Sequence, residues 1–418
     1  LLRTEGLTLT YDIRGDVIAS SDGTGVFAAS YDNGQRLKTV TYAGQVTVTY
    51  TYDARSQLTR VADSKSGAWI AFGYDADGNL AIITRSNTVN TALTYNAAGD
   101  LTRIRDGEIA DQQYTLNANG ETIRQTRILP YDPLPDVPAP AEDLTYDDAG
   151  QISSPGYAYD QRGRQIAAPN RTFSYDGASR LIAVSEGGVS ASFTYNGLGD
   201  ITARASQGVA TTYEHGYALP GAPIVAEGQD ASYKRFYVYA PSGELLYSVD
   251  AASGAVRFYH YDRVGSTLFL TDGGGAVSDA YAYDSYGRLL GQMGSSDQPF
   301  TYIGQYGVRR EPVGNLYDMR ARAYDPTTAR FLTRDPLWPD VVDPQSLNPY
   351  QYAAQNPLLY VDPAGTTNLK DLAYMVKSLL DKWGKSGKKV VQEAAKQPGK
   401  TLGKGAGKGG KAIGTGES

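Results

Sequence analysis

Cysteine is absent from this 418-residue chain, and histidine occurs only twice. The lack of cysteine excludes disulfides and thiolate metal sites, although it does not identify the cellular compartment. Two histidines form no cluster of metal ligands, so the sequence predicts neither a metal site nor a cofactor. No apolar run approaches the roughly 20 residues that a membrane-spanning helix requires. The sequence starts at Leu1 and shows no apolar leader, which suggests the C-terminal part of a longer protein.

Tyrosine and glycine, in contrast, are abundant. The chain has 33 tyrosines against 9 phenylalanines, and it has 47 glycines. Tyrosine favours half-buried positions on β-strands, and glycine adopts the positive φ angles that tight turns need. The composition therefore predicts many short strands joined by sharp turns.

The charge is unevenly distributed along the chain. The formal net charge is −6, but residues 366–418 contain 11 lysines and 4 acidic residues, or +7, which leaves −13 on residues 1–365. The sequence thus combines an acidic body with a basic tail.

A short motif recurs through the first half of the chain. It consists of Tyr, then Asp or Asn, two variable residues, Gly or Ser, one variable residue and an aliphatic residue. Clear copies cover 11–17, 52–58, 74–80, 95–101, 146–152, 175–181 and 195–201, and looser copies begin at Tyr31, Leu116 and Tyr159. The first six copies follow one another at steps of 20 to 22 residues. Such spacing indicates a repeat architecture rather than chance.

Each position of the motif has a physical role. The Asp or Asn side chain accepts hydrogen bonds from the turn backbone, Gly adopts the left-handed conformation, and the aliphatic residue starts the returning strand. Between turns the residues alternate, with Val46, Val48 and Tyr50 on one face and Thr47 and Thr49 on the other. A unit of about 21 residues therefore holds two strands, and neighbouring units must stack to bury a face.

One segment interrupts this pattern. Tyr131-Asp132 is followed by proline, and it lies within a cluster of prolines at positions 130, 133, 135, 138 and 140. Proline lacks the N–H group that a β-ladder uses. Residues 129–141 are therefore predicted to form a Pro-rich surface excursion.

A series of further motifs follows in the second half of the chain. They are His260–Ser266, Tyr283–Arg288, Phe300–Gln305, Leu316–Pro326, Arg330–Pro336, Asn348–Tyr352, Asn356-Pro357 and Asp362–Gly365. In this order they are similar to the RHS-associated core, here roughly 255–365. With the repeats, they resemble the YD/RHS repeat family, which includes bacterial Rhs proteins, the C components of insecticidal Tc toxins and the animal teneurins.

The resemblance implies an all-β fold. A long antiparallel sheet of YD repeats would spiral into a shell or partial cocoon, with the RHS core closing one end and a short α-helical tail after it. We expect a repeat sheet over 1–254, an RHS-associated core over 255–365 and a basic tail over 366–418. Because about 365 residues form a small wall, upstream sequence or partner shell chains are expected to complete it.

The resemblance also implies one candidate reaction. Many Rhs proteins resemble self-cleaving aspartyl proteases that carry two DPxG motifs and cut shortly after the second. The matching carboxyls are Asp335 and Asp362, with a cut expected near Thr366, and Arg334 is a candidate to hold one carboxylate ionised. Two carboxyls that share a buried site acquire separated pKa values, so one acts as base and the other as acid.

The sequence departs from that pattern in three places. Trp338 replaces the first motif's glycine, residues 339–346 lengthen the spacer, and Thr366 stands where an apolar residue is usual. The alternative interpretation is that both Asp-Pro pairs form turns in a structural plug. Apart from a single self-cleavage, the sequence does not suggest an enzyme. His215 and His260 are interpreted as structural polar residues, since no complete catalytic set surrounds either.

The tail has a helical pattern. Apolar residues recur at helical spacing through 368–384, with Asn368 as N-cap and Gly384 as stop, and the stretch is rich in lysine. A second short helix is expected over 388–396, followed by a Gly/Lys-rich end. The tail is either an effector, a membrane-binding helix or a segment docked on the acidic body; docking is favoured.

The leading hypothesis is therefore the β-sheet shell of a bacterial RHS-type delivery or cell-surface system. Such a shell would enclose or present its own C-terminal segment, and the protein would be secreted or located at the cell surface. The alternative is an adhesion module whose tyrosine-rich faces bind a glycan or a partner protein. Nothing in the sequence suggests nucleic-acid binding. Exposed tyrosine rows would favour adhesion, and buried tyrosines would favour the shell.

Overall fold

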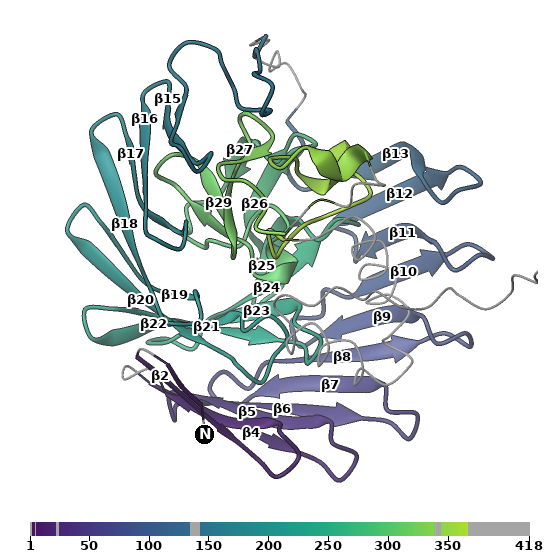
Figure 1. Cartoon of the computed structure of the whole chain (residues 1–418). Helices are drawn as coiled ribbons and strands as arrows, with labels where there is room; N and C mark the ends of the chain where they lie inside the picture. Colours follow the sequence, from purple (N-terminus) through teal and green to yellow (C-terminus); the bar gives the residue numbers. More distant parts are fainter. Residues whose placement is uncertain are drawn as a thin grey trace, which may run out of the picture. The chain divides into compact units, whose positions relative to one another are not determined.

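The computed structural model describes residues 2–4, 6–21, 25–133, 143–337, 339 and 344–366. The chain forms two compact units, Leu1–Lys385 and Ser386–Ser418, and all of the described residues belong to the first. Within the described ranges there is no α-helix, and nearly all regular structure is antiparallel β-sheet (Figure 1). The prediction of an all-β fold is confirmed. The predicted tail helices at 368–384 and 388–396 lie outside the described residues.

The first sheet contains thirteen strands that pair in chain order. They are β1 (Leu2–Thr4), β2 (Leu7–Tyr11), β3 (Val17–Ser21), β4 (Val26–Tyr31), β5 (Leu37–Tyr42), β6 (Val46–Tyr52), β7 (Leu58–Asp63), β8 (Trp69–Tyr74), β9 (Leu80–Arg85), β10 (Thr91–Tyr95), β11 (Leu101–Asp106), β12 (Ala110–Leu116) and β13 (Thr122–Ile128).

The second sheet contains fourteen strands, again in chain order. They are β14 (Ala158–Tyr159), β15 (Gln165–Ala168), β16 (Arg171–Tyr175), β17 (Leu181–Glu186), β18 (Val189–Tyr195), β19 (Ile201–Ser206), β20 (Val209–His215), β21 (Ile224–Gln229), β22 (Ser232–Tyr239), β23 (Leu245–Asp250), β24 (Val256–Tyr261), β25 (Thr267–Asp272), β26 (Val277–Tyr283) and β27 (Leu289–Met293). The expected domain boundary at 254/255 falls in the turn between β23 and β24, within this continuous sheet.

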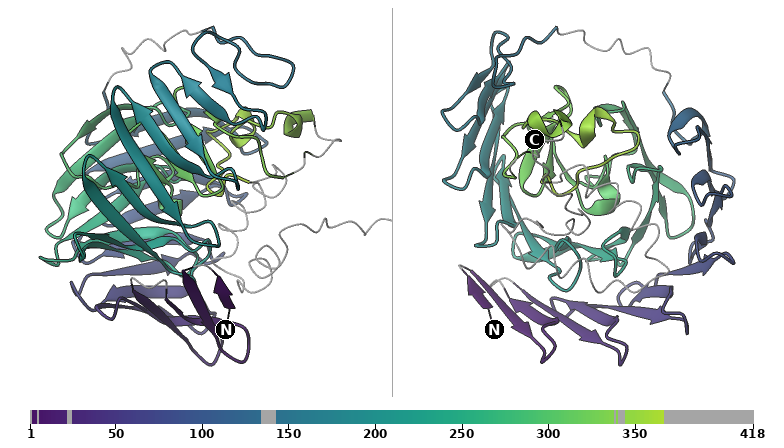
Figure 2. Two further views of the ribbon diagram at one scale, coloured as in Figure 1. Left: turned by 60° about the vertical axis from the view of Figure 1, so that its left-hand side comes forward. Right: turned by 45° about the vertical axis from the view of Figure 1, so that its right-hand side comes forward.

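A small sheet of four strands comes next in the chain. Its strands are β28 (Arg309–Glu311), β29 (Leu316–Met319), β30 (Arg322–Asp325) and β31 (Arg330–Phe331), and three 3₁₀-helices flank them: η1 (Gly304–Tyr306), η2 (Pro344–Leu347) and η3 (Ala353–Gln355). Leu316 of the small sheet belongs to the same buried cluster as Val184 and Phe193 of the second sheet; Figure 2 shows the strands from two further sides. None of the helices among the described residues is long and apolar enough to cross a membrane.

The YD motif forms the turn that its sequence predicts. In the copy at Tyr52-Asp53, the Asp53 carboxylate accepts hydrogen bonds from the backbone N–H groups of Arg55 and Gln57, both at 2.8 Å. Asn does the same at Asn96 and Asn117. The Gly position is left-handed, with φ of 88° at Gly78. Because each side chain closes its own turn locally, the repeat forms the same hairpin wherever it occurs.

The tyrosine of the motif makes a contact that the sequence did not reveal. Its hydroxyl donates a hydrogen bond to a backbone carbonyl of an earlier repeat, at the start of the returning strand. In most cases the accepting carbonyl belongs to the aliphatic residue of that repeat's motif. The pairs are Tyr31–Val17, Tyr52–Leu37, Tyr74–Leu58, Tyr95–Leu80, Tyr175–Gln165, Tyr195–Leu181, Tyr261–Leu245 and Tyr283–Thr267. Each repeat is thereby tied to its neighbour by a side chain as well as by the β-ladder.

Between the two large sheets the strand ladder breaks at β13 and β14. This break contains the Pro-rich segment, which explains it, because proline cannot donate to a ladder. Before the prolines, Leu129 and Tyr131 pack against the apolar cluster of Phe269 and Ala280 on the second sheet. Residues 134–141 of the predicted excursion lie outside the described residues.

The main core lies between the first and second sheets. Val40, Tyr42 and Val48 from the first sheet and Tyr239 and Tyr247 from the second are all fully buried in one cluster. Hydrogen bonds cross the same interface: the Tyr50 hydroxyl donates to the Tyr239 carbonyl at 3.1 Å, and the Tyr247 hydroxyl donates to Asp63 at 3.1 Å. The two sheets thus bury their apolar faces against each other, as repeat units of this length must.

Candidate functional site

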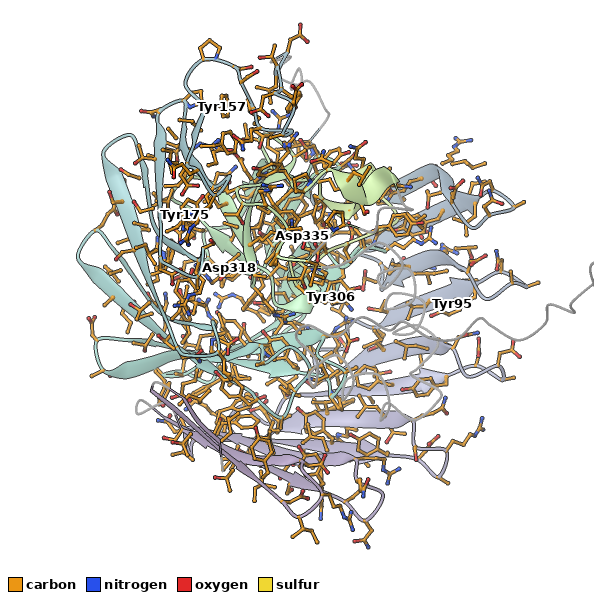
Figure 3. All side chains as sticks on the ribbon, in the orientation of Figure 1. Tyr95, Tyr157, Tyr175, Tyr306, Asp318 and Asp335 are labelled. Atoms are coloured by element: carbon orange, nitrogen blue, oxygen red, sulfur yellow. The ribbon has the colours of Figure 1, made fainter. Side chains whose placement is uncertain are left out.

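Asp335 and Asp362, the two predicted catalytic carboxyls, meet at one arginine. Arg322 lies on β30, and its Nη2 is 2.9 Å from Oδ2 of Asp335 and 3.2 Å from Oδ2 of Asp362. The Arg322 side chain is 2% exposed, that of Asp362 is 5% exposed and that of Asp335 is 24% exposed. The structure therefore brings the two carboxyls to a shared, largely water-excluded position. Figure 3 labels Asp335 in its place on the ribbon.

Arg322 is fixed by further contacts. Its Nε donates to the carbonyl oxygen of Gly365 at 2.5 Å, and its Nη1 donates to that of Pro349 at 3.1 Å. The guanidinium lies 3.6 Å from the centre of the Phe331 ring, in the range of a cation–π contact. Burial lowers the pKa of Arg322, and the charges of Asp335 and Asp362 oppose that shift. One side chain thus holds both carboxyls and the chain at Gly365.

The two carboxyls have different surroundings. Burial raises the pKa of Asp335, the charge of Arg322 opposes this, and the nearby Asp362 adds to the rise. Asp362 accepts a hydrogen bond from the backbone N–H of Thr366 at 3.3 Å, in addition to its contact with Arg322. The two carboxyls that share Arg322 therefore differ in their exposure and in their hydrogen-bond partners.

The lengthened spacer does not separate the two motifs, because the chain segments on either side of it are hydrogen-bonded together. The Asp335 N–H donates to the Pro349 carbonyl at 2.9 Å, and the Phe331 N–H donates to the Tyr350 carbonyl at 3.0 Å. The N–H of Ala321, next to Arg322, donates to the Ala364 carbonyl at 3.2 Å. Trp338 lies outside the described residues.

Arg334 occupies a different position from the one expected. Its side chain is exposed, and no carboxylate of the described part of the chain lies within ion-pair distance of it. The cation at the carboxyls is instead Arg322, which the sequence marks only as one member of the motif Leu316–Pro326. The sequence signal that could have identified Arg322 is the alternation of β30, which turns Arg322 and Tyr324 to a buried face. Arginine is rarely expected on a buried face, so this signal is weak.

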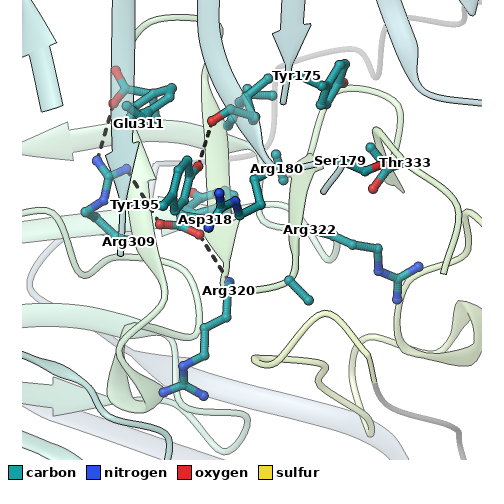
Figure 4. Close-up of a pocket in the computed structure, with 16 residues that line it drawn as sticks. Tyr175, Ser179, Arg180, Tyr195, Arg309, Glu311, Asp318, Arg320, Arg322 and Thr333 are labelled. Carbon is teal, nitrogen blue, oxygen red and sulfur yellow. Dashed lines mark hydrogen bonds and ion pairs between the residues drawn. The ribbon is translucent and has the colours of Figure 1, made fainter. Parts of the chain in front are cut away.

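A pocket adjoins this site between the second and small sheets (Figure 4). Arg322 and Thr333 line one part of it, and Arg309, Glu311 and Asp318 line another. Arg309 lies 3.3 Å from Glu311 and 3.7 Å from Asp318. Burial raises the pKa of Asp318, and Arg309 opposes that rise. Arg309, Glu311 and Asp318 are thus paired with one another within the small sheet.

Two buried ion pairs attach the small sheet to the second sheet. Arg171 on β16 contacts Asp325 at 2.6 Å, with side chains 7% and 0% exposed. Arg204 on β19 binds Glu311 in a bidentate contact of 2.6 and 2.7 Å. These pairs fix the position of β28 and β30, and hence of Arg322, relative to the repeats.

The two histidines lie elsewhere. His260 is fully buried between the first and second sheets and contacts Asp106 and Thr271. Both ring nitrogens of His215 face backbone carbonyls, those of Ala222 and Ile201 at 2.7 Å each. Neither histidine is near the paired carboxyls among the contacts that the structure describes.

The fold and its plugged repeat sheet define the class of a YD-repeat shell protein, and the comparisons agree. A family model described as Teneurin YD-shell matches residues 43–172 and 94–358. Because these matches cover well over half of the sequence, the chain belongs to the teneurin YD-shell family. The resemblance found in the sequence is confirmed.

A solved structure shows the same fold. The chain is similar to the crystal structure of TcdB2-TccC3 without its hypervariable C-terminal region, with a TM-score of 0.63 and 15% identity over 87% of this chain and 24% of that chain. It also matches the Photorhabdus luminescens Tc holotoxin pore with a TM-score of 0.43 and 14% identity, over 86% of this chain and 20% of that one. The latter score is too low to support an argument.

One curated protein has local sequence similarity. Salivary gland surface protein 1 of Aedes aegypti is 33% identical over 80 residues, or 19% of this chain and 2% of that protein. The chain thus spans a quarter or less of each of these three proteins.

Proposed function

We propose that this chain forms part of an RHS-type shell that encloses or presents its own C-terminal segment. The two large repeat sheets would be its wall, and the small sheet would be its plug. The observation that carries the proposal is the fixed position of the chain at Gly365. Arg322 binds the Gly365 carbonyl from β30, and buried ion pairs join the small sheet to the repeats. The chain therefore leaves the plug from a rigid point, which suits holding or presenting the C-terminal segment.

The tyrosines favour a shell over an adhesion module. Eight repeat tyrosines donate their hydroxyls to backbone carbonyls, and many tyrosine rings belong to the buried core. Among the described residues, Tyr146 is the one tyrosine that is largely exposed to solvent, at 49%. Stacking on a glycan requires rows of exposed rings, whereas a wall requires rings that bind repeat to repeat.

We propose in addition a single self-cleavage near Thr366. Asp362 would take a proton from a water molecule, whose oxygen attacks the carbonyl carbon of the scissile peptide bond. Asp335, whose pKa burial raises, would give its proton to the leaving nitrogen as the C–N bond breaks. The products are a new carboxyl terminus and a new amino terminus. Arg322 positions both carboxyls and the Gly365 carbonyl.

Intact-mass measurement of the purified chain tests the cleavage. We expect two masses that add up to the chain plus one water, with the junction near Thr366. Asp335→Asn and Asp362→Asn should each leave one uncut mass, whereas Asp147→Asn, in an exposed repeat turn, should still be cut. A single intact mass for the unmodified chain after prolonged incubation, with no difference from Asp335→Asn, would remove the self-cleavage and leave the shell proposal standing.

The remaining assignments rest on the comparisons. A chain that covers 24% of the matched TcdB2-TccC3 chain is small for a closed wall, so we propose that upstream or partner shell chains complete it. One matched protein is described as a surface protein, which supports a secreted or cell-surface location. The +7 tail and the −13 body support docking of the C-terminal segment.

A further inference from the structure

A polar cluster is buried in the interface between the first and second sheets. It joins β9–β11 of the first sheet to β24 and β25 of the second. Its three ionisable members, Arg85, Asp106 and His260, are 5%, 1% and 0% exposed. Neighbouring parts of this interface are apolar, so these charges lie far from water. Hydrogen bonds satisfy them only in part, since Nε of Arg85 and Oδ2 of Asp106 have no partner among the described residues.

His260 is the centre of the cluster. Its Nδ1 lies 2.8 Å from Oδ1 of Asp106, and its Nε2 lies 2.9 Å from the hydroxyl of Thr271. Asp106 can only accept, so Nδ1 carries the hydrogen, and Nε2 of the neutral ring accepts from Thr271. The Thr271 oxygen in turn accepts from the Asn87 amide at 2.9 Å. The ring also stacks on Phe269 at 4.3 Å, with the planes 6° apart.

Arg85 completes the cluster from the first sheet. Its Nη1 donates to the Thr91 hydroxyl at 2.6 Å, which donates to Oδ1 of Asp106 at 2.5 Å. Its Nη2 reaches across the interface to the Tyr259 carbonyl at 3.3 Å. With His260 neutral, the charges of Arg85 and Asp106 cancel.

A second proton on the His260 ring would leave the cluster with a net positive charge. The ionisable groups that act on His260 are Asp106 from β11 and Arg85 from β9; Tyr261, next to it on β24, acts on Arg85. Thr91 on β10 and Thr271 and Phe269 on β25 carry no charge. Protonated Nε2 would also meet the Thr271 hydroxyl, whose oxygen already accepts from Asn87. No further carboxylate of the described residues is placed to compensate.

We propose that this cluster is an acid-sensitive latch between the two sheets: His260 holds them together while its ring is neutral, and protonation at Nε2 separates β11 from β24. The latch goes beyond the shell function and does not depend on self-cleavage. It would let the wall open at this seam in an acidic environment while each sheet keeps its own ladder.

The direction of the effect is set by the histidine equilibrium. Burial lowers the pKa of His260 to about 4, Arg85 contributes to that shift, and Asp106 opposes it. When the sheets separate, the ring regains the ordinary pKa of about 6.5. The contribution of His260 to the closed state is therefore complete above pH 6.5 and is lost as the pH falls toward 4. Between these values the opening equilibrium should increase about tenfold for each pH unit.

Hydrogen exchange of the full chain tests the latch. We expect peptides from β9–β11 and β24–β25, after correction for intrinsic exchange, to lose about tenfold protection per pH unit below 6.5. Peptides from β16–β19 should keep theirs. In His260→Asn, which retains an amide donor toward Asp106 but cannot be protonated, this pH dependence should vanish.

His215→Asn is the matched control, because His215 is the other histidine and its ring nitrogens face carbonyls of the second-sheet region, away from the seam. This variant should open at the seam as the unmodified chain does. If His260→Asn does not fold, histidine-labelled NMR of the unmodified chain gives the answer: one ring should stay neutral well below pH 6.5 and then titrate as the seam opens. Seam protection that is unchanged at pH 4.5, or pH-dependent opening that persists in His260→Asn, would overturn the latch.

Discussion

The hydroxyl of Tyr95 donates a hydrogen bond to the carbonyl oxygen of Leu80 at 2.9 Å, and burial raises its pKa to about 12. The hydroxyl therefore stays protonated, and remains a donor, throughout the neutral range. The same bond recurs in eight repeats, which explains why tyrosine outnumbers phenylalanine at this position. Sequence reasoning assigned these rings to strand faces but did not find the bond, since its acceptor is a backbone atom of another repeat.

We expect Tyr95→Phe to lower the free energy of unfolding by about 1 kcal/mol, because the Leu80 carbonyl loses its partner while the ring remains. Urea unfolding followed by fluorescence gives the difference. Tyr146→Phe is the control: Tyr146 heads a repeat of the same type but is 49% exposed, so its loss should be close to zero. Equal effects in the two variants would contradict the role of the hydroxyl.

At the scale of elements, the contact of β19 with β28 positions the candidate site. Arg204 and Glu311 form it with a bidentate ion pair, and the Glu311 side chain is 3% exposed. A carboxylate buried this deeply is stable only while its partners remain. The pair has no signature in the sequence, because the two residues lie 107 positions apart.

We expect Arg204→Met to cost about 2 kcal/mol of unfolding free energy, since two charge-assisted hydrogen bonds are lost and Arg309 remains as the partner of Glu311. Arg105→Met is the matched control. Arg105 pairs with Glu108 on the surface, with side chains 42% and 91% exposed, and its loss should cost about 0.5 kcal/mol or less. Both values come from urea unfolding at pH 7.

The same pair predicts a pH dependence. Burial alone would raise the pKa of Glu311, but its bonds to Arg204 and Arg309 outweigh this and lower it. A lowered pKa means that the stabilisation is complete above the ordinary value of about 4.5 and is lost as the pH falls below it. The difference between the unmodified chain and Arg204→Met should therefore shrink below pH 4.5. A difference that stays constant down to pH 3 would argue against the pair.

At the scale of the whole described unit, the two large sheets are held by their shared core rather than by a continuous ladder. Tyr42, Tyr50, Tyr239 and Tyr247 belong to one buried cluster that takes residues from both sheets. Hydrogen bonds from Tyr50 and Asn87 cross the interface as well. The ladder itself ends at β13 and starts again at β14.

We therefore expect the unit to survive a cut between the sheets. A specific protease site inserted within 134–142 should yield two fragments that elute together in native size-exclusion chromatography and separate in denaturant. The burial of large apolar faces supplies the attraction. As a control, a site placed in the Gly243 turn, within the second sheet, should reduce the yield of folded complex. Fragments that separate without denaturant would show that the ladder, and not the core, holds the sheets together.

The sequence by itself determined the repeats, the antiparallel all-β architecture, the family and the interruption by prolines. It could do so because the Asp53 and Asn96 side chains close their own turns, and alternation such as that of 46–52 fixes the buried face; both are local effects. Tertiary structure alone decided which distant residues meet. Asp335 and Asp362 come together on Arg322 rather than on Arg334, and His260 meets Asp106 across 154 positions. Such contacts depend on how sheets pack and where chain segments cross, and no local pattern of residues encodes that.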